Sequence, residues 1–306
     1  MIPTKTPITG HWERITETPC AHAESPFWHA PEQRLYWLDH RTHRLWRWHP
    51  ASQHLEHWEV AAAPSCVAPC RSGALLLGMP DGLALAHGWG QIPQALATDP
   101  PAPQQLRLSD GKCDPWGRFW TGVAGSERGT ADPSAYCLHP LGRHTPALHV
   151  ALRGRSGTQA LAWSADGRTL YRADAQRGEL LRHRLDNPGQ WPPALGVGEV
   201  LSRFTDPAQG TPGGLAVDRL GRLWVAMVNG GRVLCLDAEG RLLADLPTPA
   251  QCPTMLCFGD PDLQTLYLTT ARAGRSDAEL AHFPGSGCVF ALRVDSPGLP
   301  TGFYWD

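Results

Sequence analysis

The sequence predicts an all-β fold: a six-bladed β-propeller with four-stranded blades around a central channel. A turn phrase built around Gly recurs along the whole chain, and its copies follow one another at a period of about fifty residues. No long segment carries apolar residues at helical spacing. We expect one propeller domain to occupy residues 1–306.

Each copy of the turn phrase predicts a β-hairpin. An apolar strand ends, a polar pair and a Gly follow, and after a basic residue the chain resumes as an apolar or aromatic strand. Gly117, Gly167 and Gly221 occupy the turn of the three clearest copies, where a positive φ is needed. In chain order the six copies occupy residues 28–37, 69–77, 114–120, 164–171, 218–224 and 258–267.

Composition narrows the class of partner. The formal net charge is −2, only 18% of residues are charged, and no basic run stands out, which disfavours nucleic acid and anionic membranes. Residues 1–10 lack the apolar core of a signal peptide, and no apolar run is long enough to span a bilayer. We therefore expect a cytoplasmic protein with a small-molecule substrate, whereas the oligomeric state is left open.

The nine cysteines are odd in number and scattered. We expect them to be reduced and packed as small hydrophobic residues. Cys66 and Cys70 have the spacing of half a zinc site, but no second pair stands beside a His cluster, so a structural role is favoured.

Several segments carry a family resemblance. They are residues 23–28, 107–120, 161–171, 215–218 and the closing stretch 269–292. In this order and over nearly the whole chain, they resemble the gluconolactonase, regucalcin and luciferin-regenerating enzyme family. The resemblance implies a six-bladed propeller whose channel holds one divalent cation over a sugar-lactone site. A cation that polarises a lactone carbonyl or lowers the pKa of water would promote ester hydrolysis.

The resemblance also implies three metal ligands: a Glu from the first blade, an Asn from the fourth, and an Asp from the fifth that doubles as the base. Glu24 matches the first. Gln159 stands in place of the Asn and moves the amide oxygen out by one methylene, and Gly213 stands in place of the Asp and offers no ligand or base. The sequence thus predicts a degenerate site for a divalent cation (Ca, Mn or Zn), with Glu24 and Gln159 as weak ligands.

We expect Gln159, Arg107 and Ser109 to bind substrate. Arg107 is kept, whereas Ser109 replaces the Asn of the third blade. A retained guanidinium beside a lost amide indicates a changed ligand that still carries carbonyl or carboxylate oxygens.

His22 is a second candidate for catalysis. It lies two residues before Glu24, so both side chains share a face if both belong to one strand. The imidazole is then either a general base beside the carboxylate or a hydrogen-bonded structural group. Cys20, two residues further back, and Cys252 are more speculative candidates for a channel-mouth thiol, and inert burial is favoured for both.

Other prominent residues are expected to be structural. Asp110 and Lys112 are expected to tie blades together by hydrogen bonds. The Trp residues at equivalent blade positions are expected to pack in the core: Trp28, Trp120, Trp163 and Trp224.

Three functions remain open from the sequence. The first is a lactonase-family hydrolase of a small cyclic ester with a degenerate metal site. The second is a metal-independent cyclase, isomerase or hydrolase that uses His22 and Glu24 in the same pocket. The third is a non-catalytic binding propeller, because a fold alone does not fix a function.

Overall fold

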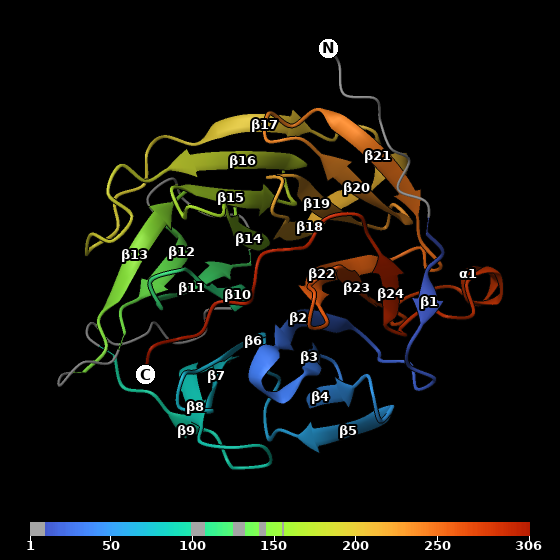
Figure 1. Ribbon diagram of the computed structural model, residues 1–306, viewed down its shortest axis with the longest axis horizontal. Coiled ribbons are helices and arrows are strands. Elements are labelled where there is room, and N and C mark those ends of the chain that lie inside the picture. The colour runs from blue at the N-terminus through green and yellow to red at the C-terminus, as the bar shows by residue number, and fades with distance from the viewer. Residues whose placement is uncertain (1–9, 99–107, 125–131, 141–144, 155) are drawn as a thin grey trace.

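A computed structural model describes residues 10–98, 108–124, 132–140, 145–154 and 156–306. Six antiparallel four-stranded sheets surround a common centre (Figure 1), which confirms the predicted six-bladed propeller. Blade 1 contains β2 (Ala23–His29), β3 (Arg34–Asp39), β4 (Arg44–His49) and β5 (His54–Glu59). Blade 2 contains β6 (Cys66–Pro69), β7 (Leu75–Met79), β8 (Gly82–Ala86) and β9 (Gln94–Ala95). Blade 3 contains β10 (Leu108–Cys113), β11 (Phe119–Val123), β12 (Pro133–Leu138) and β13 (Leu148–Arg153).

The last three blades follow the same plan, with one exchange between the ends of the chain. Blade 4 contains β14 (Ala160–Trp163), β15 (Thr169–Asp174), β16 (Glu179–Arg184) and β17 (Glu199–Arg203). Blade 5 contains β18 (Thr211–Val217), β19 (Leu223–Val228), β20 (Arg232–Leu236) and β21 (Leu242–Pro247). Blade 6 contains β22 (Pro253–Gly259), β23 (Thr265–Thr270), β24 (Phe290–Arg293) and β1 (Glu13–Arg14). Because β1 pairs with β24, the N-terminal part of the chain completes the sixth blade and closes the ring. The helical elements are short: η1 (Ala30–Glu32), η2 (Pro207–Gln209) and α1 (Asp277–His282).

In two of the three clearest copies, a buried carboxylate holds the turn phrase together. In blade 3, Asp114 accepts hydrogen bonds from the Arg118 guanidinium at 2.6 Å and the Trp120 indole at 2.7 Å. Asp218 makes the equivalent bonds in blade 5, to Arg222 at 2.6 Å and Trp224 at 3.0 Å. In these two hairpins the Asp therefore ties the turn to a Trp of the following strand.

The apolar residues pack between neighbouring blades. Trp28, Trp120 and Trp224 are at most 1% exposed, which confirms their predicted role in the core. Trp163 is also buried and contributes to the wall of a cavity described below. The cores of successive blades thus meet along the faces of the sheets.

The first strand of each blade lines the channel, and four of these six strands are irregular. Register shifts interrupt the pairing of β2 between Glu24 and Phe27 and that of β18 between Pro212 and Gly214. Similar shifts lie in β10 and β22. Bulges of this kind turn side chains to new directions. We call the end of the channel where these strands begin the Glu24 end.

The opposite end is crossed by the C-terminal segment, residues 298–305, which we call the strap (Figure 1). Gly298 forms an antiparallel bridge with Asp218, and the Leu299 amide donates to the Val217 carbonyl at 3.0 Å. At its other end, the Tyr304 amide donates to the Pro69 carbonyl at 2.8 Å. The strap thus runs from blade 5 to blade 2, and we call this side of the channel the strap end.

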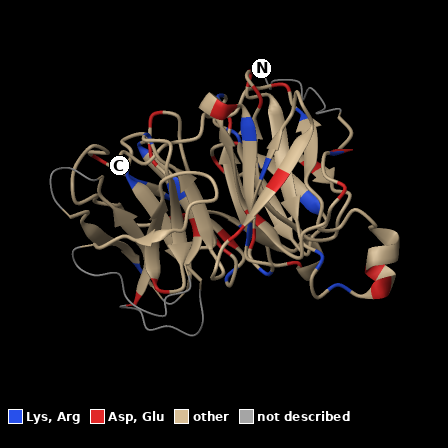
Figure 2. Ribbon diagram, turned by 90° about the horizontal axis from the view of Figure 1, so that it is seen from below, with Lys and Arg blue, Asp and Glu red and all other residues tan. Residues whose placement is uncertain are grey.

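Acidic and basic residues are interspersed over the blades, and α1 projects from the edge of the ring (Figure 2). Within the part of the chain that the structure describes, no helix is long and apolar enough to cross a membrane.

Candidate functional site at the Glu24 end of the channel

Glu24 lies between two imidazoles at the start of β2. Its Oε2 is 3.6 Å from His22 Nε2, and its Oε1 is 3.7 Å from His40 Nδ1. The carboxylate is 15% exposed, whereas the His22 and His40 side chains are 34% and 23% exposed. The three groups therefore form a partly solvated cluster that we call the His–Glu–His cluster.

Asp39, at the end of β3, holds the segment that carries His22. Its carboxylate accepts hydrogen bonds from the backbone N–H groups of Ala21 at 2.8 Å and His22 at 3.1 Å. The His40 amide then donates to the His22 carbonyl at 3.2 Å. Because the β2–β3 hairpin brings these backbones together, both histidines reach the same carboxylate.

A strained residue positions Glu24. Ser25 has φ 54°, in the left-handed region that costs a residue other than Gly about 1–3 kcal/mol. The strain is offset by contacts with neighbouring blades: the Ser25 amide donates to the Met255 sulfur at 3.2 Å, and the Val67 amide donates to Ser25 Oγ at 3.1 Å. Residues held in this way are typical of functional sites.

Ser109 and Gln159 lie at the same end, on blades 3 and 4. The Ser109 hydroxyl is buried and donates to the Thr158 carbonyl, which precedes Gln159 in the chain. Behind this contact, Arg172 Nη1 donates to Thr158 Oγ1 at 3.4 Å. The structure therefore brings Ser109 next to the backbone of the Gln159 segment, where the hydroxyl is already committed to a protein acceptor.

Gly213 sits in the bulge of β18, and the space beside it is filled. A Cβ at this position would lie 2.2 Å from Val228 Cγ2 and 3.0 Å from the Thr254 carbonyl oxygen. Thr254 in turn donates to the Ala23 carbonyl at 2.5 Å, which places Gly213 close to the start of β2. Val228 thus occupies room that a carboxylate at position 213 would need.

The donor set is a poor fit to the hard-cation site that the resemblance implies. Within the described ranges, no group of three or more His, Cys, Asp or Glu side chains is arranged to hold a metal ion. Glu24 is accompanied by imidazoles rather than by further carboxylates, whereas calcium prefers oxygen ligands. Arg107, which is predicted to bind substrate together with Ser109 and Gln159, lies outside the described residues.

Lys112 and Asp110 link blades, as predicted. Lys112 Nζ donates to the Leu215 carbonyl of blade 5 at 2.6 Å and lies 3.4 Å from Asp110 Oδ2. The same Asp110 oxygen accepts a hydrogen bond from the Leu161 amide of blade 4 at 3.2 Å. These contacts join three blades around the middle of the channel.

The thiols are unsuited to nucleophilic catalysis. All nine cysteines are free and buried. Burial raises the pKa of Cys20 to about 12, although the Trp37 indole donates to its sulfur at 3.4 Å. Burial also raises the pKa of Cys252 and brings that of Cys66 to about 12. A neutral thiol is a weak nucleophile and a weak metal ligand, so the structural interpretation holds.

Sequence reasoning missed His40. Nothing in its local sequence marks it, because its place beside Glu24 depends on the pairing register of β2 and β3, in which Glu24 faces Leu38. His40 Nδ1 also lies 3.1 Å from the Pro64 carbonyl oxygen, which anchors the ring. Only a correct hairpin register would have indicated it.

Comparisons with known proteins agree with the fold and the sequence. Residues 22–272 match the model of the SMP-30/Gluconolactonase/LRE-like region. The chain is 34% identical over 284 residues to 6-deoxy-6-sulfogluconolactonase of Pseudomonas putida, covering 93% of this chain and 95% of the relative.

Two solved structures share the fold. The calcium-binding protein regucalcin of Agrobacterium tumefaciens superposes with a TM-score of 0.82 at 24% identity, covering 95% of this chain and 96% of that one. A luciferin-regenerating enzyme superposes with a TM-score of 0.81 at 22% identity, covering 97% of this chain and all of that one. The chain belongs to the SMP-30/gluconolactonase/LRE-like family.

Proposed function

We propose that this protein is a lactone hydrolase that opens a small sugar-lactone-like cyclic ester at the Glu24 end of the channel. The observation that carries the proposal is the His–Glu–His cluster: a mostly buried carboxylate between two partly exposed imidazoles, beside a strained residue. The name of the Pseudomonas putida relative, a sugar lactonase, supports the substrate class.

In the proposed reaction, His22 acts as the general base and Glu24 holds its imidazole. His22 takes a proton from water as the water oxygen attacks the lactone carbonyl carbon. The tetrahedral intermediate then collapses, the bond between the carbonyl carbon and the ring oxygen breaks, and that oxygen receives the proton from His22. The product is the open hydroxy acid. The 3.6 Å separation between His22 and Glu24 is of the kind that tightens when substrate binds.

This proposal places the family's chemistry on different groups. Gly213 supplies no base and Val228 fills the neighbouring space, whereas two imidazoles accompany Glu24. A weak cation site on Glu24 and Gln159 belongs to the proposal only as an accessory, and no step of the reaction depends on it. Arg107 and Gln159 remain proposed contacts for substrate oxygens, and the Ser109 hydroxyl, which already donates to Thr158, is proposed to accept a hydrogen bond from a substrate hydroxyl.

The experiment is a hydrolysis assay on glucono-δ-lactone, galactono-γ-lactone and the sulfonated glucono-lactone, each with and without EDTA. We expect turnover of at least one lactone that persists in EDTA and is lost in Glu24→Gln. Turnover abolished by EDTA and restored by one divalent cation would contradict the metal-independent step and leave a metal-dependent lactonase. Saturable lactone binding without any product would instead identify a binding propeller.

The proposal includes a cytoplasmic location. Nine free, buried thiols are typical of a protein that functions in a reducing compartment.

A further inference from the structure

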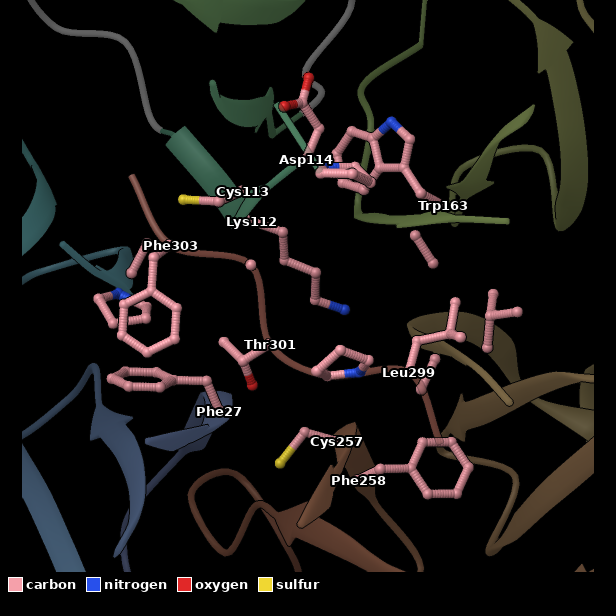
Figure 3. A pocket seen from close by; sticks show the side chains of 18 of the residues that line it. Phe27, Lys112, Cys113, Asp114, Trp163, Cys257, Phe258, Leu299, Thr301 and Phe303 are labelled. Carbon is pink, nitrogen blue, oxygen red and sulfur yellow. The ribbon is translucent and has the colours of Figure 1, made fainter. Parts of the chain in front are cut away.

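A second site is visible at the strap end of the channel. A cavity of about 610 Å³ lies there, between the final residues of the inner strands and the strap (Figure 3). All six blades contribute to its wall, yet Glu24, Ser109, Gln159 and Gly213 do not. Its volume is within the range of about 300–1,000 Å³ typical of small-molecule pockets. We call it the strap chamber.

The wall of the strap chamber is mainly apolar and aromatic. Phe27 of blade 1 and Phe303 of the strap lie on one side, and Trp163 and Phe258 lie on others (Figure 3). Phe27 is fixed by stacking on Tyr36, with ring centroids 4.9 Å apart. Thr301 of the strap projects between these groups. The chamber therefore offers flat apolar surfaces to a ring-shaped molecule.

One ammonium group reaches into this apolar space. Lys112 extends into the chamber in Figure 3, with its side chain 27% exposed. An ammonium has three protons, and its described acceptors are the Leu215 carbonyl and Asp110. A third donor position is thus available to a ligand that accepts a hydrogen bond.

The charges of the chamber wall favour an anion. Its charged side chains are Arg71, Lys112 and Asp114. Asp114 is already paired with Arg118 at 2.6 Å, whereas Arg71 stacks over the Trp305 ring at 3.9 Å and has no ion pair among the described residues. Asp110 is not part of the wall. The wall therefore contains two cationic residues, Lys112 and Arg71, and the charge of its one acidic residue is already paired.

We propose that the strap chamber is a second ligand site, which binds a small aromatic or alicyclic carboxylate. The ring packs between Phe27, Phe303 and Trp163, and the carboxylate accepts a hydrogen bond from Lys112. This site is separate from the lactone site proposed at the Glu24 end, because the two share none of the residues assigned to them.

The test is calorimetric titration of the full chain with benzoate, indole-3-acetate and cyclohexanecarboxylate, with benzamide as the neutral match of benzoate. We expect saturable binding of at least one carboxylate and weaker binding of benzamide. Lys112→Met, which keeps the apolar stem, should weaken carboxylate binding about tenfold or more, because a charge-assisted hydrogen bond is lost. Arg71→Gln should weaken it less.

A second variant guards against a folding artefact, since Lys112→Met also removes a bond to Leu215. Thr301→Phe adds volume to the strap without removing a blade contact, and it should block binding while the thermal midpoint is retained. Glu24→Gln should leave carboxylate binding unchanged. The proposal is overturned if no carboxylate binds saturably, if benzamide binds as well as benzoate, or if Glu24→Gln abolishes binding while Thr301→Phe does not.

Discussion

The two ends of the channel are built from the same six strands, yet they differ in backbone and in chemistry. At the Glu24 end, register shifts interrupt β2, β10, β18 and β22, and polar side chains gather. At the strap end, the strands have regained regular pairing, and their final residues form apolar walls under the strap. The difference indicates that backbone irregularity is concentrated where polar groups must be aimed, whereas regular pairing suffices to build an apolar chamber.

The largest expected effect tests the chemistry of the Glu24 end. Glu24→Gln keeps the shape of the side chain and removes its charge, so the imidazole of His22 loses its partner. We expect kcat to fall about a thousandfold, within the usual range for general acid–base groups. The matched control is Glu17→Gln, whose carboxylate is 81% exposed and pairs with Arg14. Equal losses in both variants would refute the assignment.

The next effect concerns the strap end. Tyr304 is fully buried, and its hydroxyl donates to the His139 carbonyl at 3.0 Å. Tyr304→Ala should lower the free energy of unfolding by about 3 kcal/mol, as for other buried aromatic residues. Tyr304→Phe should cost only about 1 kcal/mol, the usual contribution of one hydrogen bond. Chemical denaturation measures both, and kcat per folded molecule should stay unchanged if the two ends are independent.

The third prediction separates the two histidines. His22→Ala should reduce kcat at least as much as Glu24→Gln, about a thousandfold, with little change in thermal midpoint, because the proposed base is lost. His40→Ala should reduce kcat less, since its Nδ1 is also anchored by the Pro64 carbonyl. A larger fall in His40→Ala would reverse their roles, and a loss of stability without a loss of kcat would make His22 structural.

The fourth prediction restores the ligands that the family resemblance implies. Gly213→Asp with Gln159→Asn should create or strengthen divalent-cation binding, measured by calorimetry with calcium, manganese and zinc. The new carboxylate must displace Val228, so adding Val228→Ala should strengthen binding further. Val228→Ala alone is the control. A titration unchanged from the original chain in the triple variant would show that these positions do not share a site.

The smallest expected effect is a change of folding stability with pH, caused by Cys257 in the wall of the strap chamber. Burial raises the pKa of Cys257 from 9.0 to about 12. Because the folded pKa lies above the unfolded one, the stabilising contribution is complete below pH 9.0 and is lost as pH rises toward about 12. This thiol should contribute a loss of about 1 kcal/mol between pH 9 and 10. Cys257→Ser should flatten the fall of thermal midpoint with pH, and an unchanged slope would contradict the shift.

Much of the fold could be predicted because it is written in local sequence. Within the turn phrase, the Asp accepts a hydrogen bond from the Arg four residues later, as Asp114 and Asp218 show. The two-residue spacing of His22 and Glu24 likewise suggested their proximity. By contrast, His40, Val228 and the strap chamber depend on strand register and on contacts between distant segments. Contacts of this kind cannot be predicted from the residue type at a single position of one sequence.

The ring is fastened at two separate places. The seam in blade 6 includes the pairing of Glu13 and Arg14 of β1 with β24 and the hydrogen bond from the Ile15 amide to the Val289 carbonyl, whereas the strap ties blade 5 to blade 2 across the centre. If the pairing of β1 with β24 were lost, the strap would still connect blade 5 to blade 2 across the channel. Amide hydrogen exchange should therefore begin at β24 while the chamber walls remain protected. An N-terminal fusion would accordingly disturb the pairing of β1 with β24 before it disturbed either end of the channel.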